Sequence, residues 1–193
     1  MKILITGATG FIGSHMAEHA VRQGHDTWTA VRPTSNRSNL QSPSLRHIVL
    51  NLDDAELLAT QLEAHRIRHG TWDVVIHCAG ATKCRHAHEF EQINYGATRH
   101  LVDTLMRLDM VPRQFIFIST LGIYGPLHEQ APYPPFTEAD TPCPNTLYGK
   151  SKYKAEEYIK GIATLPYVIF RPTGVYGPRD RDYLLLVRSI RAH

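Results

Sequence analysis

The sequence predicts a doubly wound parallel α/β sheet with helices on both faces, and three observations lead to this. Strand-like and helix-like segments alternate along the 193 residues. The strand-like segments are nearly continuous apolar runs, as in KILIT at 2–6 and DVVIHC at 73–78, and strands buried on both faces of a parallel sheet have this pattern. A glycine-rich turn, GATGFIG, follows the first of them directly. Such a strand–helix–strand series predicts one parallel sheet.

Each element is expected where an apolar pattern lies between turn signals. The expected strands cover residues 2–6, 26–31, 47–50, 73–78, 114–119 and 167–171. The expected helices cover residues 11–23, 54–66, 86–108 and 147–160, and residues 183–193 are helix-like. Gly24 is placed to end the first helix, and Leu57, Leu58 and Leu62 are expected on one side of the second. The proline-rich loop at 125–145 is long for a connector, which indicates a functional role.

Composition and charge are those of an ordinary soluble protein. The chain is 42% hydrophobic and 20% charged, with a formal net charge of +3, and its scattered Lys and Arg residues argue against a nucleic-acid partner. Its three cysteines form no disulfide framework, which is typical of a reducing compartment. No apolar run approaches the roughly 20 residues that span a membrane, and the N-terminus lacks the pattern of a signal peptide. We therefore expect a cytoplasmic protein with a small-molecule substrate and no membrane partner.

The glycine turn is the first candidate site. Gly7, Gly10 and Gly13 lie between the first strand and the first helix, where glycine permits a positive φ and lets a phosphate approach the backbone. The helix N-terminus then offers free N–H groups to a pyrophosphate, which predicts a dinucleotide cofactor. The spacing is GxxGxxG, with Ala8 where the better-known GxGxxG pattern has its second glycine. The alternative is a glycine-rich turn without a ligand.

The end of the second strand bears on which dinucleotide binds. The strand ends in Ala30-Val31-Arg32 and offers no carboxylate to the ribose 2′-hydroxyl. Arg32, with Arg37, suits a 2′-phosphate, and this favours NADP over NAD, unless Arg32 is only a solvated loop residue. After the third strand, Asn51 is in the expected place to contact adenine.

A tyrosine and a lysine form the second candidate site. Tyr148 and Lys152 are four residues apart and would share one face of a helix. A neighbouring ammonium is expected to lower the pKa of the phenol, so that Tyr148 can exchange a proton with a substrate hydroxyl while hydride leaves the same carbon. Ser119 and Thr120 end the fifth strand and could hydrogen-bond the reacting oxygen; the alternative is that they only satisfy backbone groups.

The stretch VIHCAGATKCRHAH at 75–88 concentrates histidine and cysteine and raises the question of a metal site. His77 and Cys78 are neighbours on a strand and should point to opposite faces, and His86 and His88 should diverge at a helix start. We therefore expect no metal here. The histidines and Cys84 are expected to be surface and helix-start residues without assigned chemistry.

Six motifs occur in the same order as in a known family: GATGFIG, VIHCAG, INYGAT, FISTLGIYG, PFTEADTPCPNTLYGKSK and FRPTGVYGP. Through them the chain resembles the extended short-chain dehydrogenase/reductase family, the NAD-dependent epimerase/dehydratase group, over essentially all 193 residues. The resemblance implies a Rossmann fold, with Tyr148 as catalytic base, Lys152 orienting the nicotinamide ribose, Thr120 as the catalytic hydroxyl and Asn94 as a structural residue. The cofactor-binding residues it implies, together with those reasoned above, are Gly7, Gly10, Phe11, Ile12, Gly13, Arg32, Asn51, Leu52, Ala79, Gly80, Ala81, Ser119, Tyr148, Lys152 and Pro172.

Two departures from the family pattern narrow the function. Thr120 is followed by Leu121 and Gly122 rather than by an acid pair, which disfavours dehydration. Gly174 lies where many nucleotide-sugar enzymes of this family have an asparagine that touches substrate. RPTGVYGP, with AVRP at the second strand, also resembles the reductase and hydroxysteroid-dehydrogenase branch.

Three functions follow from the resemblance. The first is an NAD(P)-dependent epimerase or oxidoreductase of a nucleotide sugar; the second is a reductase or dehydrogenase of a non-sugar ketone or alcohol; the third is a non-catalytic NAD(P)-binding module. Family members continue into a C-terminal substrate lobe, so residues 1–193 are expected to be the NAD(P)-binding domain with that lobe largely missing, and to bind cofactor with weak or absent turnover. The resemblance also implies a homodimer through helix 86–108 and the helix carrying Tyr148.

Overall fold

The computed structural model describes residues 1–128, 130, 132–180 and 182–191, and its centre is one six-stranded sheet. All five strand pairs are parallel, and the strand order is β3-β2-β1-β4-β5-β6. The strands are β1 Lys2–Thr6, β2 Asp26–Val31, β3 Arg46–Val49, β4 Val74–His77, β5 Gln114–Ile118 and β6 Tyr167–Phe170. The predicted doubly wound fold is confirmed, and the order reverses between β1 and β4, where sheets of this kind bind ligands.

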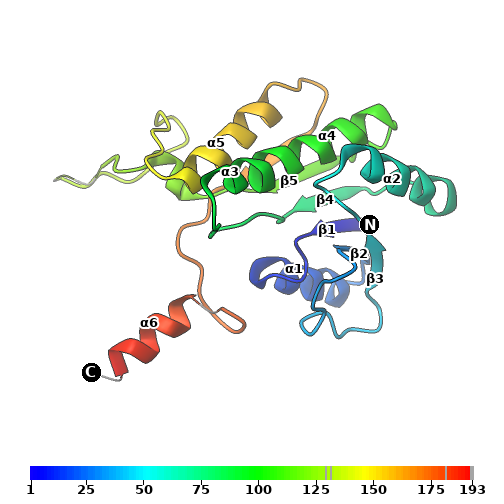
Figure 1. The fold of residues 1–193 in the computed structure, drawn as a ribbon, viewed down its shortest axis with the longest axis horizontal. Helices are drawn as coiled ribbons and strands as arrows, with labels where there is room; N and C mark the ends of the chain where they lie inside the picture. Colours follow the sequence, from blue (N-terminus) through cyan, green and yellow to red (C-terminus); the bar gives the residue numbers. More distant parts are fainter. Residues whose placement is uncertain (129, 131, 181, 192–193) are drawn as a thin grey trace.

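Helices cover both faces of the sheet (Figure 1). They are α1 Phe11–Arg22, α2 Ala55–His69, α3 Ala87–Phe90, α4 Ala97–Arg107, α5 Leu147–Lys160 and α6 Asp182–Arg191, with a 3₁₀ turn, η2, at Leu121–Tyr124. In Figure 1, α2, α4 and α5 lie on one side of the sheet and α1 on the other, while α6 lies beyond α1. The helix-like segment predicted at 183–193 is α6, and its last two positions lie outside the described residues.

The alternation of side chains along each strand divides the core in two. Leu4, Val75 and Phe117 are fully buried in the layer beneath α2, α4 and α5. Ile5 and Ala17 are fully buried in the layer between the sheet and α1. Both faces of the central strands are therefore covered, which explains why these strands are continuous apolar runs in the sequence.

Two details differ from the sequence expectation. Leu57 is 43% exposed, whereas Leu58 and Leu62 are fully buried, so the prediction that all three share the buried side of α2 was wrong for Leu57. The long helix predicted at 86–108 is interrupted by a π-helical segment, η1 Glu91–Gly96, between α3 and α4. Single π turns of this kind often lie at functional sites.

None of the helices in the described part of the chain is both long enough and apolar enough to cross a membrane.

Candidate cofactor and active site

A cavity of about 1160 Å³ opens at the carboxyl ends of the strands. The predicted site residues that line it are Gly7, Gly10, Phe11, Ile12, Gly13, Arg32, Leu52, Ala79, Gly80, Ser119, Thr120, Tyr148, Lys152 and Pro172. The structure therefore gathers the glycine turn, the Tyr–Lys pair and the strand-five hydroxyls around one space. Asn51 and Ala81 are not among its lining residues.

The glycine turn packs backbone against backbone. Gly7 has φ +64°, and a Cβ built on it would lie 2.6 Å from the amide nitrogen of Ala79. A Cβ on Gly13 would lie 2.4 Å from the carbonyl oxygen of Gly7. Gly10 caps α1 without any side-chain hydrogen bond to the first turn, so the helix N-terminus faces the cavity with its amide groups uncapped. This cradle fits a pyrophosphate.

Ser119 provides a second observation that fits a bound dinucleotide. It is 2% exposed and lines the cavity. Its hydroxyl oxygen is buried and has no hydrogen-bond partner among the described residues. A buried hydroxyl without a partner costs free energy, so a polar ligand group at this wall would satisfy it.

The start of α5 brings Tyr148 to Thr120. The Thr146 hydroxyl accepts a hydrogen bond of 3.0 Å from the Gly149 amide and caps the helix. A Cβ on Gly149 would lie 2.6 Å from the carbonyl oxygen of Gly122, so the helix packs closely on η2. Burial raises the pKa of Tyr148, while a hydrogen bond with Thr120 acts in the opposite direction.

Lys152 lies one turn further along α5 and is 3% exposed. Its Nζ lies 4.0 Å from the ring centroid of Phe117, and burial lowers its pKa to about 7. The prediction that a lysine ammonium lowers the pKa of Tyr148 was wrong, because burial has the largest effect on both groups and raises the pKa of the phenol.

Asn94 connects the loop after β4 to α5. It is fully buried in η1; its Oδ1 accepts from the Ala81 amide at 2.8 Å, and its Nδ2 donates to Ala81 O at 3.0 Å and to Ser151 Oγ at 2.9 Å. Ser151 in turn donates to Tyr148 O at 2.8 Å. A Cβ on Gly80 would lie 2.8 Å from Asn94 Oδ1. Ala81 therefore holds the loop in place rather than lining the cavity.

The far end of the cavity is lined by Arg32 from the end of β2 and by Leu52 and Asp53 after β3. Asn51 instead stabilises the chain after β3. Its Oδ1 accepts from the Asp53 amide at 3.1 Å, and its own amide donates to Gln61 Oε1 at 2.8 Å. Because Asn51 does not line the cavity, its position does not support the hypothesis that it contacts adenine. Asp53, two residues later, takes the place at the cavity wall.

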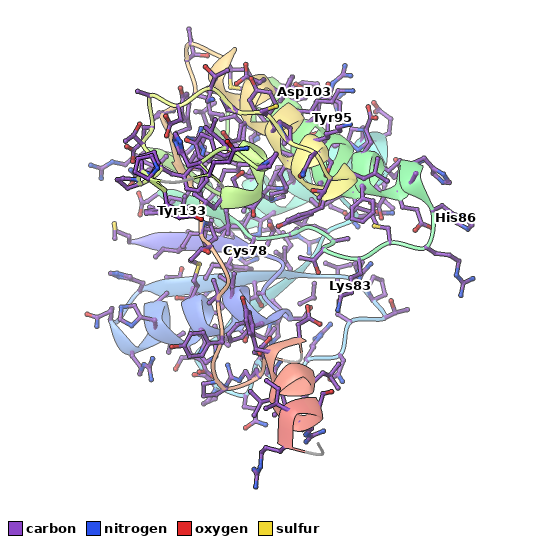
Figure 2. The ribbon with its side chains drawn as sticks, turned by 90° about the vertical axis from the view of Figure 1, so that its left-hand side faces the viewer. Cys78, Lys83, His86, Tyr95, Asp103 and Tyr133 are labelled. Carbon is purple, nitrogen blue, oxygen red and sulfur yellow. The ribbon has the colours of Figure 1, made fainter. Side chains whose placement is uncertain are left out.

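The histidines and cysteines of residues 75–88 do not gather in one place. Figure 2 shows Cys78 apart from His86. His77 is fully buried: the Thr6 hydroxyl lies 2.7 Å from its Nδ1 and the Thr98 hydroxyl 3.0 Å from its Nε2. Cys78 points the other way, with its sulfur 3.6 Å from the Met16 sulfur. The expectation that His77 is a surface residue was wrong, because it packs in the core with its pKa lowered to about 3 by burial.

The rings of His86 and His88 do not diverge as expected. They stack with centroids 5.7 Å apart. Within the described part of the chain, no group of three or more His, Cys, Asp or Glu side chains is arranged to hold a metal ion.

The segment after β6 contributes lining residues that the sequence analysis missed. Arg179 lines the cavity; its Nη1 donates to Ser14 Oγ at 3.2 Å and its Nη2 pairs with Glu18 on α1. Asp182 also lines the cavity. It pairs at 2.6 Å with Lys83, which lies on the loop after β4 and is labelled in Figure 2. No local sequence signal marks these residues, because their partners are 99 to 165 positions away in the chain.

Known proteins resemble the chain in sequence and in structure. The model of the "NAD dependent epimerase/dehydratase family" matches residues 3–192. A Bacillus subtilis protein named "Uncharacterized UDP-glucose epimerase YtcB" is 31% identical over 212 residues, covering 100% of this chain and 62% of its own length. The structure of UDP-glucose 4-epimerase with UDP-glucose from Thermotoga maritima is 27% identical with a TM-score of 0.80, covering 95% of this chain and 59% of its own.

A second solved structure, the Bordetella bronchiseptica enzyme WbmG in complex with NAD and UDP, is 26% identical with a TM-score of 0.79. It covers 100% of this chain and 60% of its own, so the chain spans about three fifths of the length of these relatives. The family model covers nearly the whole chain, and the cavity is lined by the glycine turn and the Tyr–Lys pair through which the sequence resembles this family. The chain therefore belongs to the NAD-dependent epimerase/dehydratase family.

Proposed function

We propose that the chain binds a nicotinamide dinucleotide in the cavity and acts on a nucleotide sugar as an epimerase or oxidoreductase by transient hydride transfer. One observation carries the proposal: Thr120, Tyr148 and Lys152 line the same cavity as the uncapped N-terminus of α1. The cradle formed by Gly7 and Gly13, and the unpartnered Ser119 hydroxyl, support a dinucleotide on the protein side.

The bound nicotinamide would supply the hydride acceptor and donor. Tyr148 would take the proton of a sugar hydroxyl as the carbon is oxidised and return it when the carbon is reduced. Thr120, which lines the cavity beside Tyr148, would orient the reacting oxygen. Lys152, which is buried one turn further along α5, would donate to the ribose hydroxyls, and the positive charge of an oxidised nicotinamide would favour the phenolate.

The relatives support a nucleotide sugar as substrate. The Thermotoga structure contains UDP-glucose, and the Bordetella structure contains NAD and UDP. Dehydratases are also among the relatives, such as a dTDP-D-glucose 4,6-dehydratase of Dictyostelium discoideum at 28% identity. Epimerisation is favoured here because Leu121 and Gly122 follow Thr120 where elimination of water would need an acid and a base.

One observation favours the second candidate, a reductase of a non-sugar ketone. Gly174 lines the cavity without a side chain to touch a sugar nucleotide. The two candidates differ in their effect on the cofactor: an epimerase returns the hydride, whereas a ketone reductase consumes one NAD(P)H for each product formed.

We also propose a homodimer through α4 and α5. The two helices are held together by Tyr158 and Asp103, while Lys154 on α5 pairs with Glu91 in η1, which precedes α4. They would form a paired outer surface for a second copy across a two-fold axis. Sedimentation of the purified chain tests this, since a monomer at micromolar concentration would contradict it.

The experiment that tests the proposed activity is incubation with UDP-glucose and cofactor, followed by separation of sugar isomers and measurement of reduced cofactor. An isomer that forms without net NAD(P)H change supports the epimerase. Net NAD(P)H consumption with a ketone substrate would support the reductase. The Tyr148→Phe variant should abolish either reaction and leave cofactor binding unchanged.

A further inference from the structure

The Tyr183 side chain fills the space beside Gly174 at the cavity wall. Gly174 follows β6 and Tyr183 is the second residue of α6, and both residues line the cavity. A Cβ atom built on Gly174 would lie 1.7 Å from the hydroxyl oxygen of Tyr183 and 2.8 Å from its Cζ. The tyrosine hydroxyl therefore fills the space that any side chain at position 174 would need, and the two cannot be present together in this arrangement.

The backbone around Tyr183 is held in place from several sides. The Tyr183 amide donates to Asp180 Oδ2 at 3.0 Å, and the Asp182 amide donates to Asp180 Oδ1 at 3.1 Å, which caps the start of α6. The Asp182 carboxylate accepts from Lys83 Nζ at 2.6 Å. The rings of Tyr183 and Tyr176 have centroids 6.0 Å apart. These contacts present the phenol to the cavity from a segment anchored to the loop after β4.

The position of Gly174 assigns this phenol to the reacting end of the cavity. The Leu121 amide donates to Pro172 O at 2.9 Å, so the segment after β6 lies directly beside the turn that follows Thr120. In the sheet, the glycine turn follows β1, and β4 and β5 separate β1 from β6. A ligand that reaches past the nicotinamide toward Thr120 would meet Gly174 and Tyr183.

We propose that Tyr183 is a substrate-recognition residue whose hydroxyl contacts the sugar of a nucleotide sugar, and that Gly174 is the glycine that admits it. This inference rests on the proposed nucleotide-sugar function. The phenol supplies, from α6, the polar group that position 174 lacks. A tyrosine hydroxyl both donates and accepts hydrogen bonds, and it therefore suits a sugar hydroxyl.

Four variants test the pair: Tyr183→Ala, Tyr183→Phe, Gly174→Ala and the double variant Gly174→Ala/Tyr183→Ala. Gly174 lacks the positive φ that would strain an alanine, and the three atoms nearest to the added Cβ all belong to the end of the flexible Tyr183 side chain. Gly174→Ala should therefore keep the fold and displace Tyr183. Leu185→Ala serves as the control, because Leu185 is 60% exposed on the same helix and does not line the cavity.

Titration calorimetry with UDP-glucose, UDP and NAD measures the outcome on cofactor-loaded protein. Each single variant should weaken UDP-glucose binding roughly tenfold, the effect of one lost hydrogen bond. The double variant should bind no more weakly than either alanine single variant, since both remove the same contact. Binding of UDP and of NAD should stay within about twofold of wild type in every variant, as should all binding by Leu185→Ala.

Additive losses in the double variant would overturn the pairing of Gly174 with Tyr183. Equal losses for UDP and UDP-glucose would overturn the assignment to the sugar, and unchanged UDP-glucose binding in Tyr183→Ala would overturn the contact itself. If wild type binds NAD but neither UDP nor UDP-glucose, the proposed function fails and this inference fails with it. If wild type binds UDP-glucose and every variant binds it equally well, this inference alone is refuted and the proposed function stands.

Discussion

Arg171 and Glu156 form a bidentate ion pair between the end of β6 and α5. Arg171 Nε lies 3.1 Å from Glu156 Oε1 and its Nη2 lies 2.7 Å from Oε2, and the carboxylate is fully buried. Arg171 Nη1 also donates to the Tyr124 hydroxyl, which donates to Thr137 O at 3.0 Å. The arginine therefore joins α5, η2 and the proline-rich loop.

Arg171→Met should destabilise the protein by about 3 kcal/mol, because the buried carboxylate loses its bidentate partner and, among the described residues, keeps an ion pair with Lys160 at 3.6 Å. Urea unfolding measures this. The double variant Arg171→Met/Glu156→Met removes both charges and should recover most of the loss. A cost under about 1 kcal/mol for Arg171→Met would show that the pair does not hold these elements together.

Gly7→Ala should cost about 3 kcal/mol and lower cofactor affinity at least tenfold, since it adds left-handed strain and a clash with the Ala79 backbone. Gly24→Ala is the matched control: Gly24 has φ +75° but nothing within 4 Å of the added Cβ. It should cost about 1 kcal/mol and leave cofactor binding unchanged. Thermal unfolding and NAD titration measure both variants. Equal effects would mean that close packing of the turn is unimportant.

Arg32 should give NADP an advantage over NAD, because it lines the cavity directly after β2 and the end of that strand supplies no carboxylate to a ribose 2′-hydroxyl. Arg32→Ala should lower NADP affinity about tenfold and leave NAD affinity nearly unchanged. Arg37→Ala is the control, because Arg37, which the sequence suggested as a second phosphate contact, does not line the cavity. Calorimetric titration with both cofactors checks this. Tighter binding of NAD by wild type would contradict the assignment.

His65 should make the protein sensitive to acid. It is 4% exposed, stacks on Trp72 with centroids 4.1 Å apart, and burial followed by the charge of Lys2 lowers its pKa to about 4. The unfolded chain takes up a proton near pH 6.5, before the folded one does, so stability should fall between about pH 6.5 and pH 4.

His65→Phe should remove roughly 2 kcal/mol of this fall, because a phenyl ring can stack on Trp72 without titrating. It also removes an Nε2 that is buried without a partner among the described residues. His19→Gln, on the exposed side of α1, is the control. Unfolding curves from pH 8 to pH 4 measure the difference, and parallel curves for wild type and His65→Phe would refute the prediction.

The sequence was sufficient to predict features set by local pattern. Continuous apolar strands, the glycine turn and the four-residue spacing of Tyr148 and Lys152 are fixed by neighbouring residues, and the structure places them as expected. Features that depend on burial were not accessible. The four-residue spacing predicts that Tyr148 lies near Lys152, but it does not show that both are buried, and burial raises the pKa of the phenol.

Long-range packing accounts for the other differences. His77 follows an apolar run, but both of its ring nitrogens are engaged only because Thr6 on β1 and Thr98 on α4 pack against it. Asn51 and Asp53 are close in sequence, and the direction of the chain after β3 decides which lines the cavity. The contact between Gly174 and Tyr183 depends on where α6 lies.

The most direct test of the proposed function is a single-turnover reaction in which cofactor-loaded protein is in excess over UDP-glucose. Sugar isomers and reduced cofactor are quantified over time, with Tyr148→Phe in parallel. The chain spans about three fifths of its relatives' length and its steady-state turnover is expected to be weak, so the prediction concerns one turnover: wild type yields a second isomer or transient reduced cofactor, and Tyr148→Phe binds both ligands and yields neither. Wild type that binds both ligands and leaves UDP-glucose and cofactor unchanged would contradict hydride transfer on a nucleotide sugar in this cavity.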